Sequence, residues 1–348
     1  MMTTLTINDD MTSLHCSFGN LKFLDGIENL INLTNLDCSI NQLTSIINIQ
    51  NLTNLTTLKC SNNLLRSFLY LQNLTNLTTL KCNNNKLTTL NGIQNLTNLE
   101  HLDCSGNYLK NIPNLSSLTY LDCSGNCLKN IPNLSSLTYL DCSSNYISSL
   151  EIKTNLETLI CRHNKLTDIE FENSISKLIK IDCSNNELTH FKYTSFEDLT
   201  EFDCCDNRFY SFNGINSANL EYLYCSYNQL ISLNINSESL IYLKCSYNQL
   251  TSLNINSNSL MALDCSNNQL TSLNINSKLL EFIFFNNNMI TDINSFQNLI
   301  NLKRIDCENN MITFLPIELL NLRHLESIEY AGNLIENIHP LMTRFLSR

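Results

Sequence analysis

Cysteine is the residue type with the widest chemical repertoire in this chain, and 16 of its 348 residues are Cys. Thiols form disulfides, ligate metals and act as nucleophiles, and the spacing of the residues indicates which use is present. Most of these Cys recur every 19 to 23 residues in one column, which we call the anchor column. It contains Cys16, Cys38, Cys60, Cys82, Cys104, Cys123, Cys142, Cys161, Cys183, Cys204, Cys225, Cys245 and Cys265, and it continues through Phe285, Cys307 and Tyr330.

The anchor column is predicted to consist of reduced thiols packed in a hydrophobic core. Phe285 and Tyr330 replace Cys in it, which indicates an inward apolar position, and a free Cys packs as a small hydrophobe. Cys residues of neighbouring repeats would lie about 4.8 Å apart, so disulfides stay open as an alternative. The first ten residues lack the basic and apolar segments of a secretory signal, so we expect a reducing, cytoplasmic location. No C-x-x-C pair or Cys/His cluster occurs, so we expect no metal and no cofactor.

Catalytic chemistry has little support in the sequence, and we predict that the chain is not an enzyme. No nucleophile motif occurs, and 7 Gly leave little room for a phosphate-binding loop. His163 follows Cys161, but that thiol belongs to the anchor column and is expected to face away from the imidazole. Cys127 lies outside the column and arises from a duplication, since Cys123–Asp141 repeats Cys104–Asp122 with this one difference. The six His are scattered over different repeats: His15, His101, His163, His190, His324 and His339.

A second column places Asn three residues after the anchor in nearly every repeat. Each repeat must turn its backbone inside a stack, where buried N–H and C=O groups need partners. An Asn amide has two donors and an acceptor, so it can bridge one turn to the next. We therefore predict a structural ladder of Asn41, Asn63, Asn85, Asn107, Asn126, Asn145, Asn164, Asn186, Asn207, Asn228, Asn248, Asn268, Asn288, Asn310 and Asn333.

A short strand, a turn and a return arm must position these columns in each repeat. Apolar and polar residues alternate before the anchor, which is the period of a strand. After the turn, Leu43, Ile46 and Ile49 recur every three residues, which indicates a 3₁₀-like arm. The sequence NQLTSLNINS at Asn248–Ser257 and Asn268–Ser277, with the near-copy NQLISLNINS at Asn228–Ser237, predicts extended arms instead. A fixed period of this length is typical of a solenoid, in which each repeat contacts its neighbours.

The repeats leave no room for a second domain, so we predict a single solenoid over residues 1–348 with about sixteen repeats. Residues 1–10 are expected to form an N-terminal cap and residues 11–338 the repeats. Residues 339–348 are expected to form a C-terminal cap through Leu341 and Phe345. The segment Leu315–Ile335 predicts a longer and more helical return arm than its neighbours.

The pattern L-x-x-L-x-[LC]-x-x-N-x-L, repeated over essentially the whole chain, resembles leucine-rich repeats. The resemblance implies an α/β solenoid bent into a horseshoe, with a concave parallel β-sheet and short 3₁₀ or extended arms on the convex side. Repeats such as LDCSNNQLTSLNINS resemble those of bacterial surface proteins and of amoeba-infecting giant viruses. A viral source would place the protein in the host cytoplasm. Members of the family usually bind partners on the concave strand face.

Two outward positions on each strand, one and three residues before the anchor, are the candidate partner-binding positions. The residue just before the anchor is acidic in nine of sixteen repeats. This stripe would attract a basic partner, but Asp is also common there in the family without a shared ligand, so both interpretations stay open. Aromatic residues at these positions are typical interface anchors. The predicted binding residues are Tyr120, Asp122, Tyr139, Asp141 and a favoured patch of Tyr222, Tyr224, Tyr242, Phe282 and Phe284.

The net charge of −11 disfavours sequence-independent nucleic-acid binding and a basic membrane contact, both of which depend on Lys and Arg. No run of about 18 apolar residues suited to a membrane helix occurs. We predict a monomeric, non-catalytic scaffold that binds a protein partner on its concave face. Two alternatives stay open, a substrate-recognition subunit of an enzyme complex such as a ubiquitin ligase, and a secreted or surface adhesin.

Overall fold

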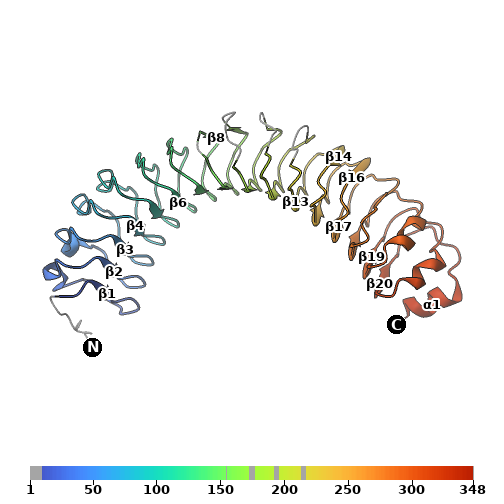
Figure 1. Ribbon diagram of the computed structural model, residues 1–348, viewed down its shortest axis with the longest axis horizontal. Coiled ribbons are helices and arrows are strands. Elements are labelled where there is room, and N and C mark those ends of the chain that lie inside the picture. Colours follow the sequence, from blue (N-terminus) through green and yellow to red (C-terminus); the bar gives the residue numbers. More distant parts are fainter. Residues whose placement is uncertain (1–9, 154, 172–176, 192–195, 213–216, 348) are drawn as a thin grey trace. The chain divides into compact units, whose positions relative to one another are not determined.

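The protein is described by a computed structural model over residues 10–153, 155–171, 177–191, 196–212 and 217–347 (Figure 1). The chain divides into two compact units, unit 1 (Met1–Ile175) and unit 2 (Ser176–Arg348), and each is described by itself. Residues 1–9 of the predicted N-terminal cap lie outside the described residues. That residues 1–348 form one solenoid stays a prediction.

Unit 1 is built on a parallel sheet of three-residue strands that lie side by side in chain order. Their register matches from strand to strand, so that Leu121 lies beside Leu140 of the next strand. The return arms contain the 3₁₀ helices η1 (Ile27–Asn29) and η2 (Ile47–Ile49) and a separate parallel pair, β8 (Ser149–Ile152) with β10 (Asp168–Phe171). The sheet strands are β1 (Ser13–His15), β2 (Asn35–Asp37), β3 (Thr57–Lys59), β4 (Thr79–Lys81), β5 (His101–Asp103), β6 (Tyr120–Asp122), β7 (Tyr139–Asp141) and β9 (Thr158–Ile160).

Unit 2 repeats this architecture with its own parallel strands in chain order. Its return arms hold the parallel pair β14 (Ser232–Ile235) and β16 (Ser252–Ile255), the 3₁₀ helices η3 (Asn294–Asn298) and η4 (Ile317–Asn321), and the terminal helix α1 (Pro340–Leu346). Within the described residues, no helix combines the length and the apolar character that crossing a membrane requires. The sheet strands are β11 (Lys180–Asp182), β12 (Glu201–Asp203), β13 (Tyr222–Tyr224), β15 (Tyr242–Lys244), β17 (Ala262–Asp264), β18 (Phe282–Phe284), β19 (Arg304–Asp306) and β20 (Ser327–Glu329).

Strand alternation decides which side chains enter the core. The middle residue of each sheet strand is buried, and so is the anchor two residues later except at half-buried Tyr330 in the last repeat. Leu121 and Cys123 both have 0% exposure. Within each unit, the strands line the concave side and the return arms the convex side (Figure 1). The predicted α/β solenoid with a parallel sheet and 3₁₀ or extended arms is confirmed. Two of the three arms predicted to be extended contain strands, β14 in 228–237 and β16 in 248–257, whereas the arm in 268–277 contains none.

The turn after each described sheet strand uses a left-handed residue two positions after the anchor. Its φ angle is 54° at Asn84, 62° at Gly125 and 55° at Asn267. Gly and Asn adopt this conformation at the lowest cost, since Gly has no Cβ and the short Asn side chain tolerates it. Part of the Asn enrichment of the chain is therefore a requirement of the turn.

Two sequence predictions for the C-terminal region were wrong in detail. The arm within Leu315–Ile335 contains only the five-residue η4, because the chain must enter β20 at Ser327. Helix α1 contacts η4, and it buries Met342 completely, whereas Leu341 is 57% exposed. Residues three apart share a helix face, so Met342 faces the repeats together with half-buried Phe345.

Candidate functional site

Two rows of half-exposed side chains cross the strand face of each unit. The first and third residues of a strand point outward, while the middle residue is buried. All predicted partner-binding residues lie in these rows. Tyr120 and Asp122 lie on β6, Tyr139 and Asp141 on β7, Tyr222 and Tyr224 on β13, Tyr242 on β15, and Phe282 and Phe284 on β18.

Three rings of unit 1 form a continuous stack across β5, β6 and β7. The centroids of His101 and Tyr120 are 4.0 Å apart at an interplanar angle of 11°, and those of Tyr120 and Tyr139 are 4.3 Å apart at 6°. Burial, followed by repulsion from Lys81, lowers the pKa of His101, so the imidazole in the stack is neutral near pH 7. Burial raises the pKa of both tyrosines, which stay protonated. The sequence interpretation did not include His101, although it occupies the same strand position as the two tyrosines.

The acidic stripe has a structural function in the turn. Oδ1 of Asp122 accepts hydrogen bonds from the Ser124 N–H at 3.0 Å and from the Ser124 hydroxyl at 2.7 Å. Burial raises the pKa of Asp122, while the bonds from Ser124 lower it and the charges of Asp141 and Asp103 raise it. A short carboxylate two residues before an N–H closes a local turn. The same backbone bond is made by Asp37, Asp103, Asp141, Asp182, Asp203, Asp264 and Asp306.

Positions without Asp in this row are therefore informative. Tyr224 and Phe284 occupy the stripe without being able to accept the turn bond, so their presence calls for another explanation. Tyr224 lies against Tyr242 of the next strand, with ring centroids 5.5 Å apart at 40°. Tyr222 and Tyr242 are register partners in the other row. The structure thus brings the three predicted tyrosines together on β13 and β15.

The two predicted phenylalanines form a separate group on β18. Strand β17 lies between them and β15, and it carries Ala262 in register with Phe282. Each ring faces a cation of the following repeat, with Lys303 5.8 Å from Phe282 and Arg304 5.7 Å from Phe284. The favoured patch is therefore two aromatic groups rather than one.

The Asn ladder lies inside the solenoid and has its own hydrogen-bond pattern. Oδ1 of Asn63 accepts from the Leu43 N–H of the preceding repeat at 2.9 Å. Its Nδ2 donates across the repeat boundary to the Cys38 carbonyl at 3.0 Å, and to the Cys60 carbonyl of its own repeat at 3.1 Å. Each such amide therefore joins two turns through otherwise buried backbone groups.

The anchor thiols are buried side chains of the core rather than exposed nucleophiles. Burial raises the pKa of Cys16 to about 11 and that of Cys307 to about 12. A thiolate is the reactive form, so these thiols are poor nucleophiles at neutral pH. Cys127 and Cys205 lie outside the column and are half-buried, and burial raises the pKa of Cys205 to about 12.

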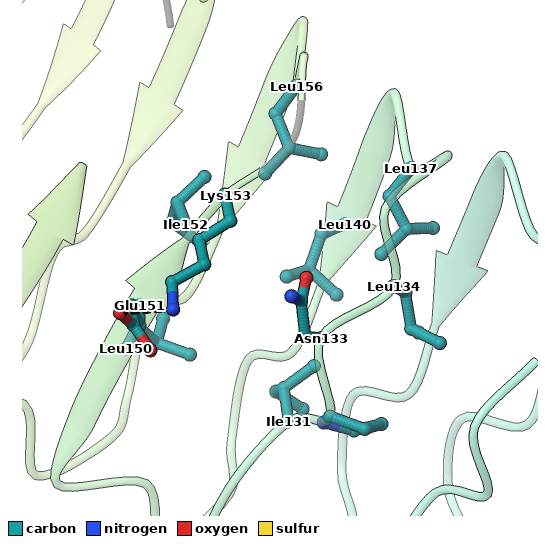
Figure 2. A pocket seen from close by; sticks show the side chains of 11 residues that line it. Ile131, Asn133, Leu134, Leu137, Leu140, Leu150, Glu151, Ile152, Lys153 and Leu156 are labelled. Carbon is teal, nitrogen blue, oxygen red and sulfur yellow. Dashed lines mark ion pairs between the residues drawn. The ribbon is translucent and has the colours of Figure 1, made fainter. Parts of the chain in front are cut away.

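Figure 2 shows an apolar notch between two return arms of unit 1. It lies between the arm at Ile131 and Pro132 and strand β8, is open to solvent, and has Leu side chains along its inner wall. Its charged members, Glu151 and Lys153, form an ion pair at 2.7 Å. The notch arises where a proline-containing arm meets an extended one, and the charged groups of its lining are paired with each other.

Catalytic and metal-binding clusters receive no support from the part of the chain that the structure describes. Within it, no group of three or more His, Cys, Asp and Glu is arranged to hold a metal ion. His15 is hydrogen-bonded to Ser13, and His190 to Thr189, in different repeats.

The comparisons with known proteins agree on one family. A sequence profile described as "Leucine Rich repeats (2 copies)" matches residues 75–117, 116–153 and 154–193. The structure is similar to that of a leucine-rich repeat protein of Leptospira interrogans, with 27% identity, a TM-score of 0.79, and coverage of 97% of this chain and 95% of that chain.

Two further solved structures are similar. The functional domain of InlJ from Listeria monocytogenes, described as including a cysteine ladder, is 28% identical, with a TM-score of 0.69 and coverage of 86% of this chain and 74% of that chain. YopM from Yersinia enterocolitica, at 24% identity, shares the fold, with a TM-score of 0.72 and coverage of 95% and 71%. The search of curated proteins found no match.

The strand-and-turn repeat with its anchor column and Asn ladder defines a parallel β-solenoid of short repeats. Residues 75–193 match the leucine-rich repeat profile, and the fold of the described residues is that of leucine-rich repeat proteins. The resemblance of its repeats to those of giant viruses stays a prediction.

Proposed function

We propose that this protein is a non-catalytic scaffold that binds a protein partner on its strand face. Leucine-rich repeat proteins generally mediate protein–protein interactions, which supports the class of function.

One observation carries the choice of surface. Eight Asp of the stripe close the turn after their strands, yet Tyr224 replaces Asp at this position and packs against Tyr242. Tyr224 cannot accept the hydrogen bond in the turn, and its ring is half-exposed rather than buried in the core. This favours a role for Tyr224 in binding rather than in folding. Tyr rings are enriched at interfaces because they combine a large apolar area with a hydrogen-bonding hydroxyl.

Affinity purification with mass spectrometry tests this proposal. The full chain is compared with Tyr222→Ala/Tyr242→Ala on β13 and β15, and with Thr57→Ala/Thr79→Ala as a control in the same row of β3 and β4. We expect the tyrosine variant to lose its specific partner and the threonine variant to retain it, with both variants folded by circular dichroism. An identical partner set for all three proteins would contradict binding at this face. Recovery of ligase subunits with the wild-type chain would instead favour the alternative of a recognition subunit.

A further inference from the structure

Two tyrosines occupy a turn position that favours Asn or Gly. Tyr227 and Tyr247 are the left-handed residues of consecutive repeats, with φ angles of 57° and 54°. Asn or Gly holds this position in most repeats, because a bulky side chain is strained there. Strain retained at particular residues is a reason to look for a function at those residues.

The two rings stack on each other without entering the core. Their centroids are 4.4 Å apart at an interplanar angle of 8°, and each residue is 48% exposed. Stacking occupies one face of each ring and leaves the other face outside the pair. Because the pair is exposed, burial of the rings does not explain why the sequence accepts the strain.

The pair extends the aromatic part of the strand face around the end of the strands. Tyr227 follows Tyr224 of β13 by three residues, and Tyr247 follows β15. Tyr224 and Tyr242 already lie 5.5 Å apart across these two strands. Two consecutive repeats thus present what we call the tyrosine surface, formed by Tyr222, Tyr224, Tyr227, Tyr242 and Tyr247.

Acidic residues flank the tyrosine surface on both sides. Glu201 and Asp203 of β12 are the register partners of Tyr222 and Tyr224, and Asp264 of β17 follows Lys244 of β15 in register. Glu201 also forms an ion pair with Lys180, whose Nζ lies 2.8 Å from Oε1 of Glu201. Partial desolvation, followed by the charge of Glu201, raises the pKa of Tyr224. Partial desolvation, followed by the interaction with Tyr247, raises the pKa of Tyr227, so both phenols stay neutral.

This combination of rings and carboxylates selects for cations. The face of a tyrosine ring attracts a guanidinium or ammonium group, and neighbouring carboxylates add a longer-range attraction. Arg suits such a site best, since its planar group stacks on rings and bonds to carboxylates. Lys244 is a cation within the surface and opposes this attraction, but it is outnumbered by the flanking acids.

We propose that the tyrosine surface docks a basic segment of a partner protein, with arginine side chains lying over the exposed rings. The inference rests on the proposed function, since it specifies the chemistry of the partner for the same strand face. It also extends that face to the left-handed turn, where Tyr227 and Tyr247 lie.

The test replaces both strained tyrosines by the residue that suits their backbone. Tyr227→Asn/Tyr247→Asn leaves the net charge at its wild-type value, so general attraction to a basic peptide is unchanged. Phe18→Asn/Ile40→Asn is the matched control, because it removes two bulky left-handed residues (φ 60° and 54°) of unit 1. Binding of fluorescein-labelled octa-arginine to each full-length protein is measured by fluorescence anisotropy at low salt, with labelled octa-glutamate for comparison.

We expect octa-arginine to bind the wild type and the control equally, and the tyrosine variant about tenfold more weakly, the effect of two lost cation–π contacts. Thermal unfolding is expected to occur at the same or a higher temperature in both Asn variants, which excludes misfolding as the cause. Equal binding by the tyrosine variant, or no preference of the wild type for octa-arginine over octa-glutamate, would overturn the inference.

The affinity purification with Tyr222→Ala/Tyr242→Ala tests the strand face, whereas the octa-arginine assay tests the chemistry of the partner. Loss of the partner there, together with a negative octa-arginine result, would leave the proposed function intact and remove only the basic partner. An unchanged partner set there would instead reject the strand face itself.

Discussion

At the scale of single residues, an Asn amide holds each repeat to the one before it. Asn145 is 6% exposed, accepts from the Leu128 N–H at 2.9 Å, and donates to the Cys123 carbonyl at 3.1 Å and the Cys142 carbonyl at 3.0 Å. The preceding repeat thus receives both a donor and an acceptor from one side chain. The amide completes the hydrogen bonding of buried backbone that the sheet itself does not reach.

Replacing Asn145 by Ala should cost about 1–3 kcal/mol of unfolding free energy, the penalty for buried backbone groups left without partners. Urea unfolding followed by circular dichroism measures it. Asn111→Ala, at an exposed position of a return arm, is the control and should be neutral. Equal stability of the wild type and Asn145→Ala would show that the ladder is dispensable.

Two substitutions of Asp122 distinguish the contribution of its hydrogen bond in the turn from that of its negative charge. Asp122→Asn keeps the side-chain oxygen that accepts from Ser124, whereas Asp122→Ala removes it and should lose about 0.5–1.5 kcal/mol. Burial raises the pKa of the Asp122 carboxyl in the folded state above its ordinary value of 3.8. Ionisation is therefore less favourable in the folded than in the unfolded protein, so the stability contributed by this group falls as the pH rises above 3.8. We therefore expect Asp122→Asn to equal or exceed the wild type in stability at pH 7, and this advantage to disappear below pH 3.8.

Urea unfolding of the three proteins at pH 7 and at the acidic end of their stability range measures both effects. Asp122→Asn being as unstable as Asp122→Ala at pH 7 would show that the negative charge, not the acceptor oxygen, holds the turn.

Residue roles that recur in every repeat could be predicted from the sequence. The inward anchor and the bridging Asn follow from alternation and from the needs of buried backbone. The turn bond of Asp122 was not predicted, because an acidic residue at an outward strand position fits a solvent-exposed charge as well as an acceptor for the N–H two residues later. His101 was missed for a similar reason, since it joins the aromatic stack only through its register with Tyr120.

At the scale of elements, the return arms differ among repeats while the strands do not. In the NINS arms a buried Ser replaces the Leu that stands eight residues before the anchor in the 22-residue repeats, such as Leu74. Ser257 donates to the carbonyls of Leu240 at 2.8 Å and Glu238 at 3.2 Å. A hydroxyl thus ties the arm to the preceding repeat where other repeats use apolar packing.

Ser257→Ala should therefore destabilise unit 2 by about 1–3 kcal/mol, because two carbonyls lose a buried donor. Ser252→Ala, at an exposed position of β16, provides the control. Chemical unfolding of both variants measures the difference, and equal stability would mean that water or the neighbouring backbone takes over the bonds.

The extended form of these arms could be predicted from the repeated NINS copies, but the buried Ser could not. The arm is rich in Asn and Ser, so the sequence does not distinguish the buried Ser from the exposed polar residues beside it. Its burial results from packing between neighbouring repeats. The C-terminal region has no copy within the chain, so Leu341 was assigned inward although the period of helix α1 buries Met342.

At the scale of the whole molecule, the oxidation state of the buried thiols indicates the compartment in which the protein folds. We propose that all 16 Cys are reduced in a cytoplasmic setting. Titration with Ellman's reagent under denaturing, non-reducing conditions should then detect close to sixteen free thiols. The native protein should react slowly, since burial raises the pKa of the anchor thiols. A titre reduced by pairs of thiols would contradict this proposal and favour a secreted adhesin.

The repeats organise each unit so that its distinctive side chains gather on the strands and the arms serve mainly to close the core. The class of fold could be predicted from the period alone. The identity of a partner could not, because the anchor and Asn columns, which dominate the sequence, face inward and carry no information about what the surface binds. We propose that a protein partner contacts the strand face.

Site-specific photo-crosslinking tests this claim most directly. Benzoylphenylalanine is placed at Tyr222 on the strand face or at Ile300, a 55% exposed residue of the return arm after η3, and the protein is irradiated in cells of its source. We predict a specific higher-mass adduct with a protein from position 222 and none from position 300. Adducts from position 300 alone, or none from either position, would contradict binding at the strand face.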